Sequence, residues 1–358
     1  MNKIHFVELL GGLGDLVIAL PAIHALALSH PQAQLTVLTF APGSELLAAD
    51  PLVQRVTTAE RGSAADPDRP RQALEALLAS ESFDLVVSDT TYAGIDALLE
   101  STGTRVVANL WRRPPPDQRI EERFLQILAG EGLIEPWAVD LKPRLALATS
   151  DRMWAAARFQ RPGRRALLHP HAGMPIKTWP EERYIALGTI LRDEFGLDIL
   201  VSAGNTRAEM ATARRLAHAL GPDTEILPSI SLGRFAAAMS YMDLVVGSDT
   251  GPVRAAAAAG ALTVSLYGPT WHGRYGLQPP HANCQGYPEC PLRDVADFTR
   301  QPCWYAGACP LGKENPAPGF AQWRTCMEDI SVGDVLEAAQ PLLDMTVWWG
   351  KPLSERTL

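Results

Sequence analysis

The sequence predicts an α/β protein with two domains of similar design, each built on a parallel sheet with helices on both faces. Short apolar runs alternate with glycine-containing turns and amphipathic segments along most of the chain, and this alternation is typical of parallel sheets. The length of 358 residues fits two domains, because a domain takes roughly 100–200 residues. A content of 47% hydrophobic and 20% charged residues excludes wholesale disorder.

Charge and hydropathy exclude several classes of protein. The formal net charge of −8 argues against a nucleic-acid binder that works through a broad basic field. The longest apolar run, residues 16–28, contains Pro21 and His24 and is shorter than the about 20 residues that a membrane span needs. Glu8 and Asp15 interrupt the start, which argues against a secretory signal. We therefore expect a cytoplasmic protein whose cysteines are reduced or metal-bound.

The first half of the chain shows the alternation in its simplest form. Its expected strands are residues 4–10, 35–40, 53–57, 84–89 and 105–108. Its expected helices are residues 16–29 and 119–129. Two polar, turn-rich stretches, residues 60–70 and 110–118, predict surface loops, and the second holds three consecutive prolines.

The second half repeats the scheme after a linker near residues 145–164. Its expected strands are residues 165–169, 198–202, 244–247 and 262–267. Its expected helices are residues 181–195, 207–220, 232–240 and 252–259. A last helix is expected after Ser331, which forms a capping-box pattern with Asp334. The predicted domains are 1–155 and 156–335, the latter with a cysteine-containing loop insertion at 270–327, followed by a helix and tail at 336–358.

The glycine-rich turn Gly11-Gly12-x-Gly14-Asp15 lies between an expected strand and an expected helix. Backbone N–H groups at such a helix start attract anions, and glycines allow close approach of a ligand. The plainer interpretation is a strand–helix turn with Asp15 as the N-cap. The dinucleotide fingerprint G-x-G-x-x-G is not met, because Val17 stands where its third Gly or Ala should be.

Two loops of the second half carry groups suited to phosphate. Lys177 lies in the loop after the expected strand 165–169, where it could act as a point charge for phosphate. Thr250 and Gly251 follow the expected strand 244–247 and precede a helix predicted to begin at Pro252, so they could donate a hydroxyl and an N–H to a diphosphate. A solvated lysine and a well-capped helix are the structural alternatives.

Two carboxylates at further strand ends could contact a sugar. Asp249 precedes the same helix and could accept hydrogen bonds from sugar hydroxyls, or could only stabilise the helix start. Glu209 follows the strand 198–202 and could contact a ribose, or could lie at an ordinary surface helix start.

Taken together, these segments resemble glycosyltransferase family 9, the bacterial ADP-heptose:lipopolysaccharide heptosyltransferases. Three motifs carry the resemblance: Gly-Leu-Gly-Asp with Pro21, the His-Pro-x-Ala-Gly…Lys-x-Trp-Pro loop at 169–180, and Ser-Asp-Thr-Gly-Pro at 248–252 followed by Leu-Tyr-Gly-Pro-Thr at 266–270. The resemblance implies the GT-B architecture, two Rossmann-like domains with parallel sheets facing across a cleft. It also implies inverting transfer from a nucleotide-diphosphate sugar, with no metal required for catalysis.

The resemblance also implies roles for single residues. Asp15 corresponds to the catalytic base, beside the glycine turn of Gly11, Gly12 and Gly14, and Lys177 matches the donor-phosphate lysine. The other implied donor-binding positions are Thr178, Glu209, Asp249, Thr250, Gly251 and Arg254. The chain departs from the family where Arg254 replaces a His, Thr178 a common Arg and His171 a Gly, which leaves the exact donor open.

All five cysteines lie between Cys284 and Cys326. Reduced packing cysteines, a structural metal and disulfides are all compatible with the spacing. Related transferases carry a similar Cys-Trp-x-x-x-x-Cys-Pro…Cys-Met pattern, which Cys303, Cys309, Cys326 and Met327 match. If a metal is bound, we expect zinc or iron, in a structural role, at Cys290, Cys303, Cys309 and Cys326.

The expected function is transfer of heptose from ADP-heptose to a hydroxyl of a saccharide or glycolipid such as the lipopolysaccharide core. The alternatives are another nucleotide sugar, a protein acceptor, an NAD-dependent oxidoreductase and a non-catalytic nucleotide-sugar-binding protein. A lipid-anchored acceptor would bring the enzyme to the cytoplasmic face of the inner membrane. Four arginines could meet anionic acceptor groups or headgroups, or could be ordinarily solvated: Arg112, Arg113, Arg119 and Arg123. Trp348 and Trp349 could rest at the membrane interface or pack on the first domain.

Overall fold

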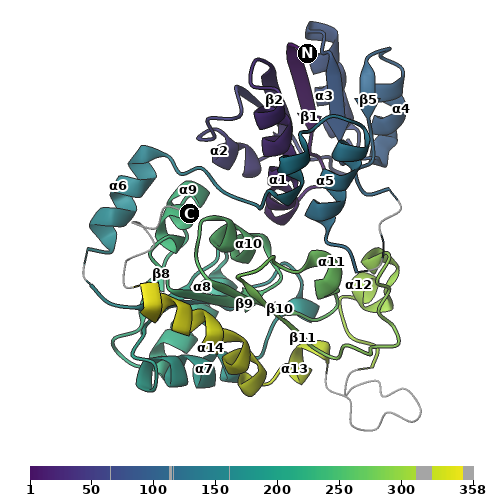
Figure 1. Cartoon of the computed structure of the whole chain (residues 1–358). Helices are drawn as coiled ribbons and strands as arrows, with labels where there is room; N and C mark the ends of the chain where they lie inside the picture. The colour runs from purple at the N-terminus through teal and green to yellow at the C-terminus, as the bar shows by residue number, and fades with distance from the viewer. Residues whose placement is uncertain (65, 113–114, 116, 161, 312–324, 350–358) are drawn as a thin grey trace. The chain divides into compact units, whose positions relative to one another are not determined.

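The computed structural model describes residues 1–358 except 65, 113–114, 116, 161, 312–324 and 350–358. The chain divides into two compact units, Met1–Ala148 and Thr149–Leu358 (Figure 1). The sequence placed the boundary at 155 and a linker at 145–164. Half of that stretch is instead helix α6 (Thr149–Arg158), which opens the second unit and contacts α9 (Leu232–Met239).

The first unit contains a five-stranded parallel sheet in the order β3-β2-β1-β4-β5. Its strands are β1 (Lys3–Val7), β2 (Gln34–Phe40), β3 (Arg55–Ala59), β4 (Leu85–Ser88) and β5 (Arg105–Val107). The chain progresses outward from β1 in one direction and then returns to place β4 on its other side. This reversal creates the switch point at which doubly wound sheets bind ligands.

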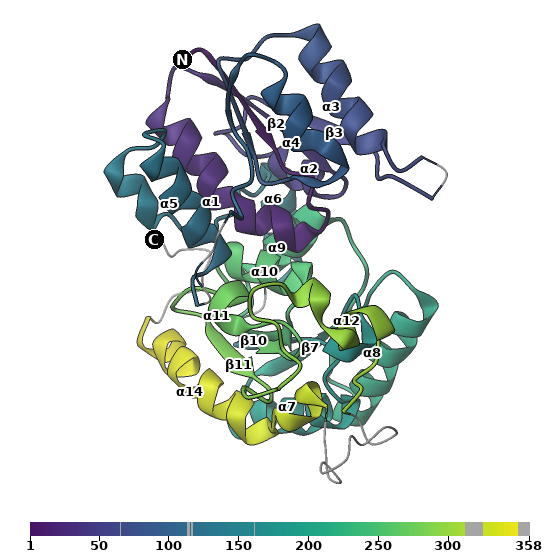
Figure 2. The ribbon, with the colours of Figure 1, turned by 90° about the vertical axis from the view of Figure 1, so that its right-hand side faces the viewer.

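Helices cover both faces of this sheet, as Figure 2 shows. They are α1 (Leu13–Ser29), α2 (Gly43–Leu47), α3 (Arg69–Ser80), α4 (Ile95–Glu100) and α5 (Ile120–Gly130). Helix α1 contacts α5, whereas α3 and α4 share a buried apolar cluster with β1, β2 and β4. Residues 16–26 of α1 are all buried, so the longest apolar run of the sequence is a core helix.

The second unit contains a six-stranded parallel sheet in the order β11-β10-β9-β6-β7-β8. Its strands are β6 (Arg165–His169), β7 (Asp198–Ser202), β8 (Glu225–Leu227), β9 (Leu244–Ser248), β10 (Thr263–Tyr267) and β11 (Ala282–Gln285). The order repeats that of the first sheet with one strand added, and the switch point lies between β6 and β9. The α/β class with two Rossmann-like sheets is therefore confirmed.

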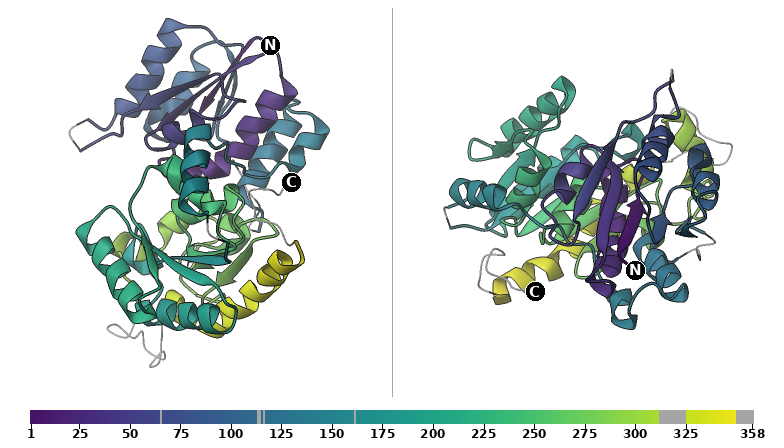
Figure 3. Two further views of the ribbon diagram at one scale, coloured as in Figure 1. Left: turned by 90° about the vertical axis from the view of Figure 1, so that its left-hand side faces the viewer. Right: turned by 90° about the horizontal axis from the view of Figure 1, so that it is seen from above.

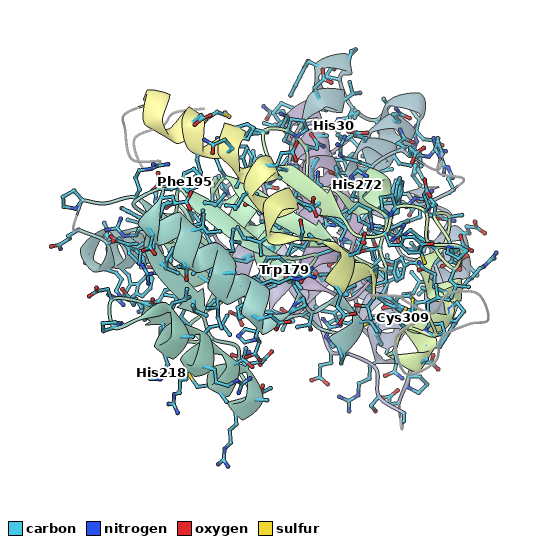
Figure 4. All side chains as sticks on the ribbon, turned by 90° about the horizontal axis from the view of Figure 1, so that it is seen from below. His30, Trp179, Phe195, His218, His272 and Cys309 are labelled. Carbon is cyan, nitrogen blue, oxygen red and sulfur yellow. The ribbon has the colours of Figure 1, made fainter. Side chains whose placement is uncertain are left out.

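The helices of the second sheet separate onto its two faces (Figures 2 and 3). One face carries α7 (Glu181–Asp193), α8 (Arg207–Leu220) and α14 (Val332–Trp349), whose apolar side chains join one core with the strands. The other carries α9 and α10 (Gly251–Ala258). Figure 4 shows Trp179 near α7 and α14, and its indole N–H donates to the carbonyl of Ile330 at 2.9 Å.

The start of α14 is capped as the sequence predicted. The backbone N–H of Ser331 donates to the Asp334 carboxylate at 2.7 Å, and the N–H of Asp334 donates to the Ser331 hydroxyl at 3.1 Å. These reciprocal bonds satisfy two donors at the helix start.

The segment 270–327, expected as a loop-like insertion, holds regular structure. It contains α11 (His272–Tyr275), the edge strand β11, the short 3₁₀ helix η4 (Phe298–Arg300), α12 (Pro302–Ala306) and the start of α13 (Cys326–Asp329). The prediction of a loop is wrong for β11, which pairs in parallel with β10. Among the described residues, no helix has the length and apolar character needed to cross a membrane.

Candidate functional site

The loops at the switch point of the second sheet bring Lys177 and Asp249 together. β6 and β9 are hydrogen-bonded neighbours in parallel, with His169 opposite Gly247, so their following loops leave the same edge. The loop after β6 carries Lys177 at the end of η3 (Pro175–Lys177), and Asp249 follows β9 directly. The Nζ atom of Lys177 lies 3.2 Å from Oδ2 of Asp249.

Asp249 is the centre of a buried charge cluster. Arg254 Nη2 donates to Asp249 Oδ1 at 2.9 Å, and the Thr270 hydroxyl donates to Oδ2 at 2.9 Å. Burial alone would raise the pKa of Asp249, but the charges of Lys177 and Arg254 lower it to about 2. Asp249 is therefore ionised at neutral pH. With two cations around one carboxylate, the cluster keeps one net positive charge.

Helix α10 points its N-terminus into this region. Thr250 is the N-cap, and the helix begins at Gly251, one residue before the start predicted at Pro252. The Thr250 hydroxyl oxygen is buried and has no hydrogen-bond partner among the residues the structure describes. Because a helix N-terminus attracts anions, this hydroxyl, the first N–H groups of α10 and Lys177 form a set of donors suited to a diphosphate.

Two other predicted donor residues lie outside the cluster. Thr178 is exposed, although it directly follows Lys177 in the same loop. The Glu209 carboxylate accepts from the N–H and the hydroxyl of Thr206 at 2.9 and 2.8 Å in a capping box, and its contact with a ribose stays a prediction. Burial raises the pKa of Glu209, but these hydrogen bonds from Thr206 leave it lowered.

Two histidines line the end of β6 as neutral, structural groups. Nδ1 of His169 lies 2.7 Å from the Ser202 hydroxyl, and Nε2 of His171 lies 3.0 Å from the Ser202 carbonyl. Burial, together with the neighbouring His171, lowers the pKa of His169 to about 3, and burial also lowers the pKa of His171. His171, one of the three positions at which the sequence departs from the family, thus has a buried side chain.

The first unit carries Asp15 at the start of α1, beyond the carboxyl end of β1. Gly12 is the N-cap, and its N–H donates to Oδ2 of Asp15 at 2.7 Å. The prediction of Asp15 as the N-cap is wrong by three residues, because Asp15 is the third residue of the helix and its carboxylate reaches back to the N–H of Gly12. Gly11 has a φ of +127° and its carbonyl accepts from Arg61, so the turn does require a glycine there.

Two buried carboxyl groups that the sequence reasoning missed lie at the switch point of the first sheet. Glu8 follows β1 and Asp89 follows β4, strands that pair in register. The Thr39 hydroxyl donates to Glu8, and the Thr90 hydroxyl donates to Asp89 at 2.7 Å. Oε1 of Glu8 and Oδ2 of Asp89 are buried without a hydrogen-bond partner among the described residues.

Their surroundings disfavour ionisation of both groups. Burial raises the pKa of Glu8 to about 7, with a smaller contribution from Asp15. Burial and the charge of Glu8 raise the pKa of Asp89 well above its ordinary range. The sequence does show an acidic residue, Glu8 or Asp89, at the end of each of two predicted strands. A single acidic residue at a strand end is too common, however, to predict that two such residues form a buried pair.

The five cysteines comprise one buried core residue, Cys284, and four that are partly buried. Cys284 lies on β11 within the core of the second unit. Burial raises the pKa of Cys326 to about 12, with contributions from Cys309, Cys290 and Cys303, so these four thiols lie within electrostatic range of one another. Figure 4 marks Cys309. Among the described residues, no three His, Cys, Asp or Glu side chains form a metal-binding group; the metal stays a prediction.

The arginines that could meet an acceptor or be ordinarily solvated make contacts within the first unit. Arg112 pairs with Glu131 at 2.5 Å, Arg119 pairs with Glu122 at 3.0 Å, and Arg123 donates to the carbonyl of Arg112. Arg113 and the side chains of Trp348 and Trp349 lie outside the described residues.

Comparison with known families decides the class of the protein. The model of glycosyltransferase family 9 (heptosyltransferase) matches residues 103–303. The chain belongs to this family. It is therefore a glycosyltransferase that moves a sugar from a nucleotide-sugar donor to an acceptor, and the oxidoreductase and non-catalytic alternatives no longer stand. No curated protein matches the sequence.

Solved structures give the same fold. A family 9 glycosyltransferase from Veillonella parvula is 16% identical with a TM-score of 0.73, covering 96% of this chain and 97% of that one. ADP-heptose lps heptosyltransferase II of E. coli is 17% identical with a TM-score of 0.67 (97% and 100%). The iron-containing dodecameric glycosyltransferase TibC of enterotoxigenic E. coli is 15% identical with a TM-score of 0.59 (96% and 76%). These likenesses show the GT-B fold that the sequence predicted.

Proposed function

We propose that this glycosyltransferase transfers heptose from ADP-heptose to a hydroxyl of a saccharide acceptor, with inversion at the anomeric carbon. The observation that carries the proposal is the convergence of Lys177 and Arg254 on Asp249 beside the N-terminus of α10. Such a site suits a nucleoside diphosphate, and the similarity to an enzyme named for ADP-heptose supports ADP as the nucleotide.

On the donor side, the cluster stabilises the leaving group. As the bond between the anomeric carbon and the phosphate oxygen breaks, its electron pair passes to that oxygen and the negative charge on the diphosphate grows. Lys177, the Thr250 hydroxyl and the first N–H groups of α10 would bind the growing charge more strongly than the ground state. Asp249 holds the two cations in place. It stays ionised because Lys177 and Arg254 lower its pKa to about 2, although burial alone would raise it.

On the acceptor side, we assign the general base to Asp15. The acceptor oxygen forms a bond to the anomeric carbon from the face opposite the leaving diphosphate, and its proton passes to a carboxylate oxygen of Asp15. The products are the glycoside, ADP and protonated Asp15, which returns its proton to water. The hydrogen bond from the Gly12 N–H fixes the carboxylate and leaves it able to accept the proton.

For the acceptor, we propose a saccharide of the lipopolysaccharide core type, supported by the name of the E. coli relative. Another nucleotide sugar or a protein acceptor are the competing versions of the same chemistry. These versions differ in the sugar or the acceptor that flanks the reacting atoms. The cluster of Lys177, Asp249 and Arg254 would bind the diphosphate in each version.

A single assay tests the proposal. Purified protein is incubated with ADP-heptose and a heptose-deficient core saccharide, and the product mass and anomeric configuration are measured. We expect addition of one heptose with inverted configuration, and none with UDP- or GDP-sugars. Transfer from another nucleotide sugar alone, or a retained configuration, would contradict the proposal.

We also propose that Cys290, Cys303, Cys309 and Cys326 hold a structural iron or zinc ion. Four thiolates suit either metal. Arg293 would offset their negative charge. Burial lowers the pKa of Arg293, whereas Cys290, Cys326 and Cys303 raise it. The similarity to an iron-containing glycosyltransferase supports iron. The metal would fasten this segment and take no part in sugar transfer.

Elemental analysis of the purified protein tests the metal. We expect about one equivalent, lost in Cys303→Ser and kept in Cys284→Ala, since Cys284 packs in the core. Less than a tenth of an equivalent in protein purified without chelators would refute the metal site.

A further inference from the structure

The cysteine-bearing segment 270–327 places an aromatic side chain, Trp304, beside the lysine of the donor cluster. Trp304 lies in α12, directly after Cys303. The Nζ atom of Lys177 lies 5.4 Å from the centroid of the Trp304 ring, within the range of a cation–π interaction. The same ammonium group pairs with Asp249 at 3.2 Å. Lys177 is thus held between a carboxylate from the loop after β9 and an indole from α12.

Further aromatic contacts fix the position of the Trp304 ring. Its centroid lies 4.3 Å from that of Phe298, and Phe298 lies 5.3 Å from Tyr275, both pairs in edge-to-face geometry. The Tyr275 carbonyl in turn accepts from Arg254 and, at 2.9 Å, from the Tyr267 hydroxyl. The two ends of this aromatic row therefore touch the two cations of the donor cluster.

This arrangement solves a problem of geometry at the lysine. An ammonium group has three N–H donors that diverge tetrahedrally at the end of a flexible stem. Asp249 accepts from it at one side, and a contact on a second side is needed to fix the direction of the remaining donors. An aromatic face on another side attracts the cation without accepting a directed, ionic hydrogen bond. The ammonium can then keep a donor available for a phosphate oxygen.

We propose that Trp304 is a positioning residue of the donor site, which orients Lys177 for the diphosphate and connects the cysteine-bearing segment to donor binding. The inference rests on the proposed function of Lys177. It differs from that proposal because it assigns a role in donor binding to a residue of the segment that the sequence predicted to be only a structural insertion.

The test measures ADP affinity by calorimetry for a set of full-length variants. We expect Trp304→Ala to weaken ADP binding by about 2- to 30-fold, the range of a partly desolvated cation–π interaction, and Trp304→Phe to recover part of the loss. The matched control is Tyr305→Ala, because Tyr305 is the next residue of α12 and its side chain is 77% exposed. Thermal melting in the absence of nucleotide checks that each variant is folded.

A double-mutant comparison separates a role through Lys177 from a general structural role. In a Lys177→Ala background, Trp304→Ala should have no further effect on ADP affinity, because there is no ammonium to orient. If Trp304→Ala reduces affinity equally in both backgrounds, or binds ADP like the wild type, the inference is overturned. If Lys177→Ala itself leaves ADP affinity unchanged, the proposed donor site fails as well.

Kinetics give a second readout. Loss of orientation should raise the donor KM and lower kcat together, because the lysine serves both binding and the leaving group. A structural role would lower the folded fraction and leave the donor KM of the folded protein unchanged. That second result would also overturn the inference.

Discussion

Two carboxyl groups of this enzyme have opposite electrostatic surroundings, although both are buried. Asp249 lies between Lys177 and Arg254, which lower its pKa to about 2 in spite of burial. Glu8 has a threonine hydroxyl but no cation among its described contacts, and burial raises its pKa to about 7. The first is thereby a permanent anion that organises two cations, and the second is a group that titrates near neutral pH.

A substitution of Asp15 tests the proposed general base directly. Replacing it with Asn keeps a side chain that can lie near the Gly12 N–H but cannot take a proton. We expect kcat to fall by about 10²–10⁴-fold, with ADP affinity unchanged because the diphosphate groups belong to the second unit. Steady-state kinetics and calorimetry measure the two quantities. Asp68→Asn, at an exposed position before α3, is the control; turnover near the wild-type value in Asp15→Asn would remove the assignment.

Glu8 predicts a pH dependence of stability. Its pKa is raised by burial from 4.5 to about 7, so between these pH values the unfolded chain releases a proton that the folded chain keeps. The free energy of unfolding contributed by this group therefore falls as pH rises across that window. Glu8→Gln has no such proton, and we expect the variant to gain stability relative to the wild type from pH 4.5 to 7 and then level off.

Urea unfolding at several pH values measures this difference. Buried His5, whose pKa burial lowers to about 4, titrates over part of the same range, but it is present in both proteins and cancels. Glu100→Gln, the same substitution at an exposed position of α4, is the control for the loss of one carboxyl group. A pH-independent difference between Glu8→Gln and the wild type would show that Glu8 is not held protonated.

At the scale of elements, β9 and α10 pack closely at Gly247. A Cβ atom added at Gly247 would lie 2.7 Å from Cγ2 of Val253 and 2.9 Å from the His169 carbonyl. Neither a backbone carbonyl nor a β-branched side chain in a helix can move away easily. The absence of a side chain at Gly247 lets α10, which begins after its N-cap Thr250, pack closely against the sheet.

Gly247→Ala should therefore move α10 and damage the donor site. We expect a loss of about 1–3 kcal/mol in the free energy of unfolding, together with weaker ADP binding. Gly333→Ala is the matched control in the same unit, since Gly333 is exposed and a Cβ there meets only the Ser331 hydroxyl at an ordinary 3.5 Å, and surface changes fall within about 0.5 kcal/mol. Equal stability and ADP affinity in the two variants would contradict the packing argument.

The elements also show what a sequence can predict. Runs such as 165–169 and 198–202 predicted β6 and β7 with the observed bounds, because fully buried parallel strands are continuously apolar. β11 is Ala-Asn-Cys-Gln and β8 has three residues, so neither has an apolar pattern. α3 was missed because Pro70 indicated a loop, whereas it lies in the first turn of the helix, where proline is tolerated.

In the candidate site, too, some contacts could be predicted from the sequence and others could not. The convergence of Lys177 and Asp249 follows from strand ends alone, because the carboxyl ends of parallel strands meet at one edge. Arg254 was recognised only as a departure from the family, and its contact with Asp249 needed the helix to be placed. Trp304 lies 127 residues after Lys177, and no local pattern indicates which cation a distant indole will meet.

For the whole molecule, the donor groups all belong to one of the two units. Lys177, Asp249, Arg254 and Trp304 lie in Thr149–Leu358, which has its own sheet and its own apolar core. We expect a fragment of residues 149–358 to fold and to bind ADP within about tenfold of the full chain, but to transfer no sugar because Asp15 is absent. Calorimetry and a transfer assay test both halves of this statement. A folded fragment that does not bind ADP would show that the first unit contributes to the donor site.

The indole beside Lys177 has a practical consequence. Tryptophan emission responds to charges brought close to the ring, and an arriving diphosphate would change the charge a few ångströms from Trp304. The protein therefore contains its own optical reporter of nucleotide occupancy. Subtracting the signal of Trp304→Phe would isolate it from the other eight tryptophans, so that donor arrival and release could be followed in a stopped-flow instrument without any attached dye.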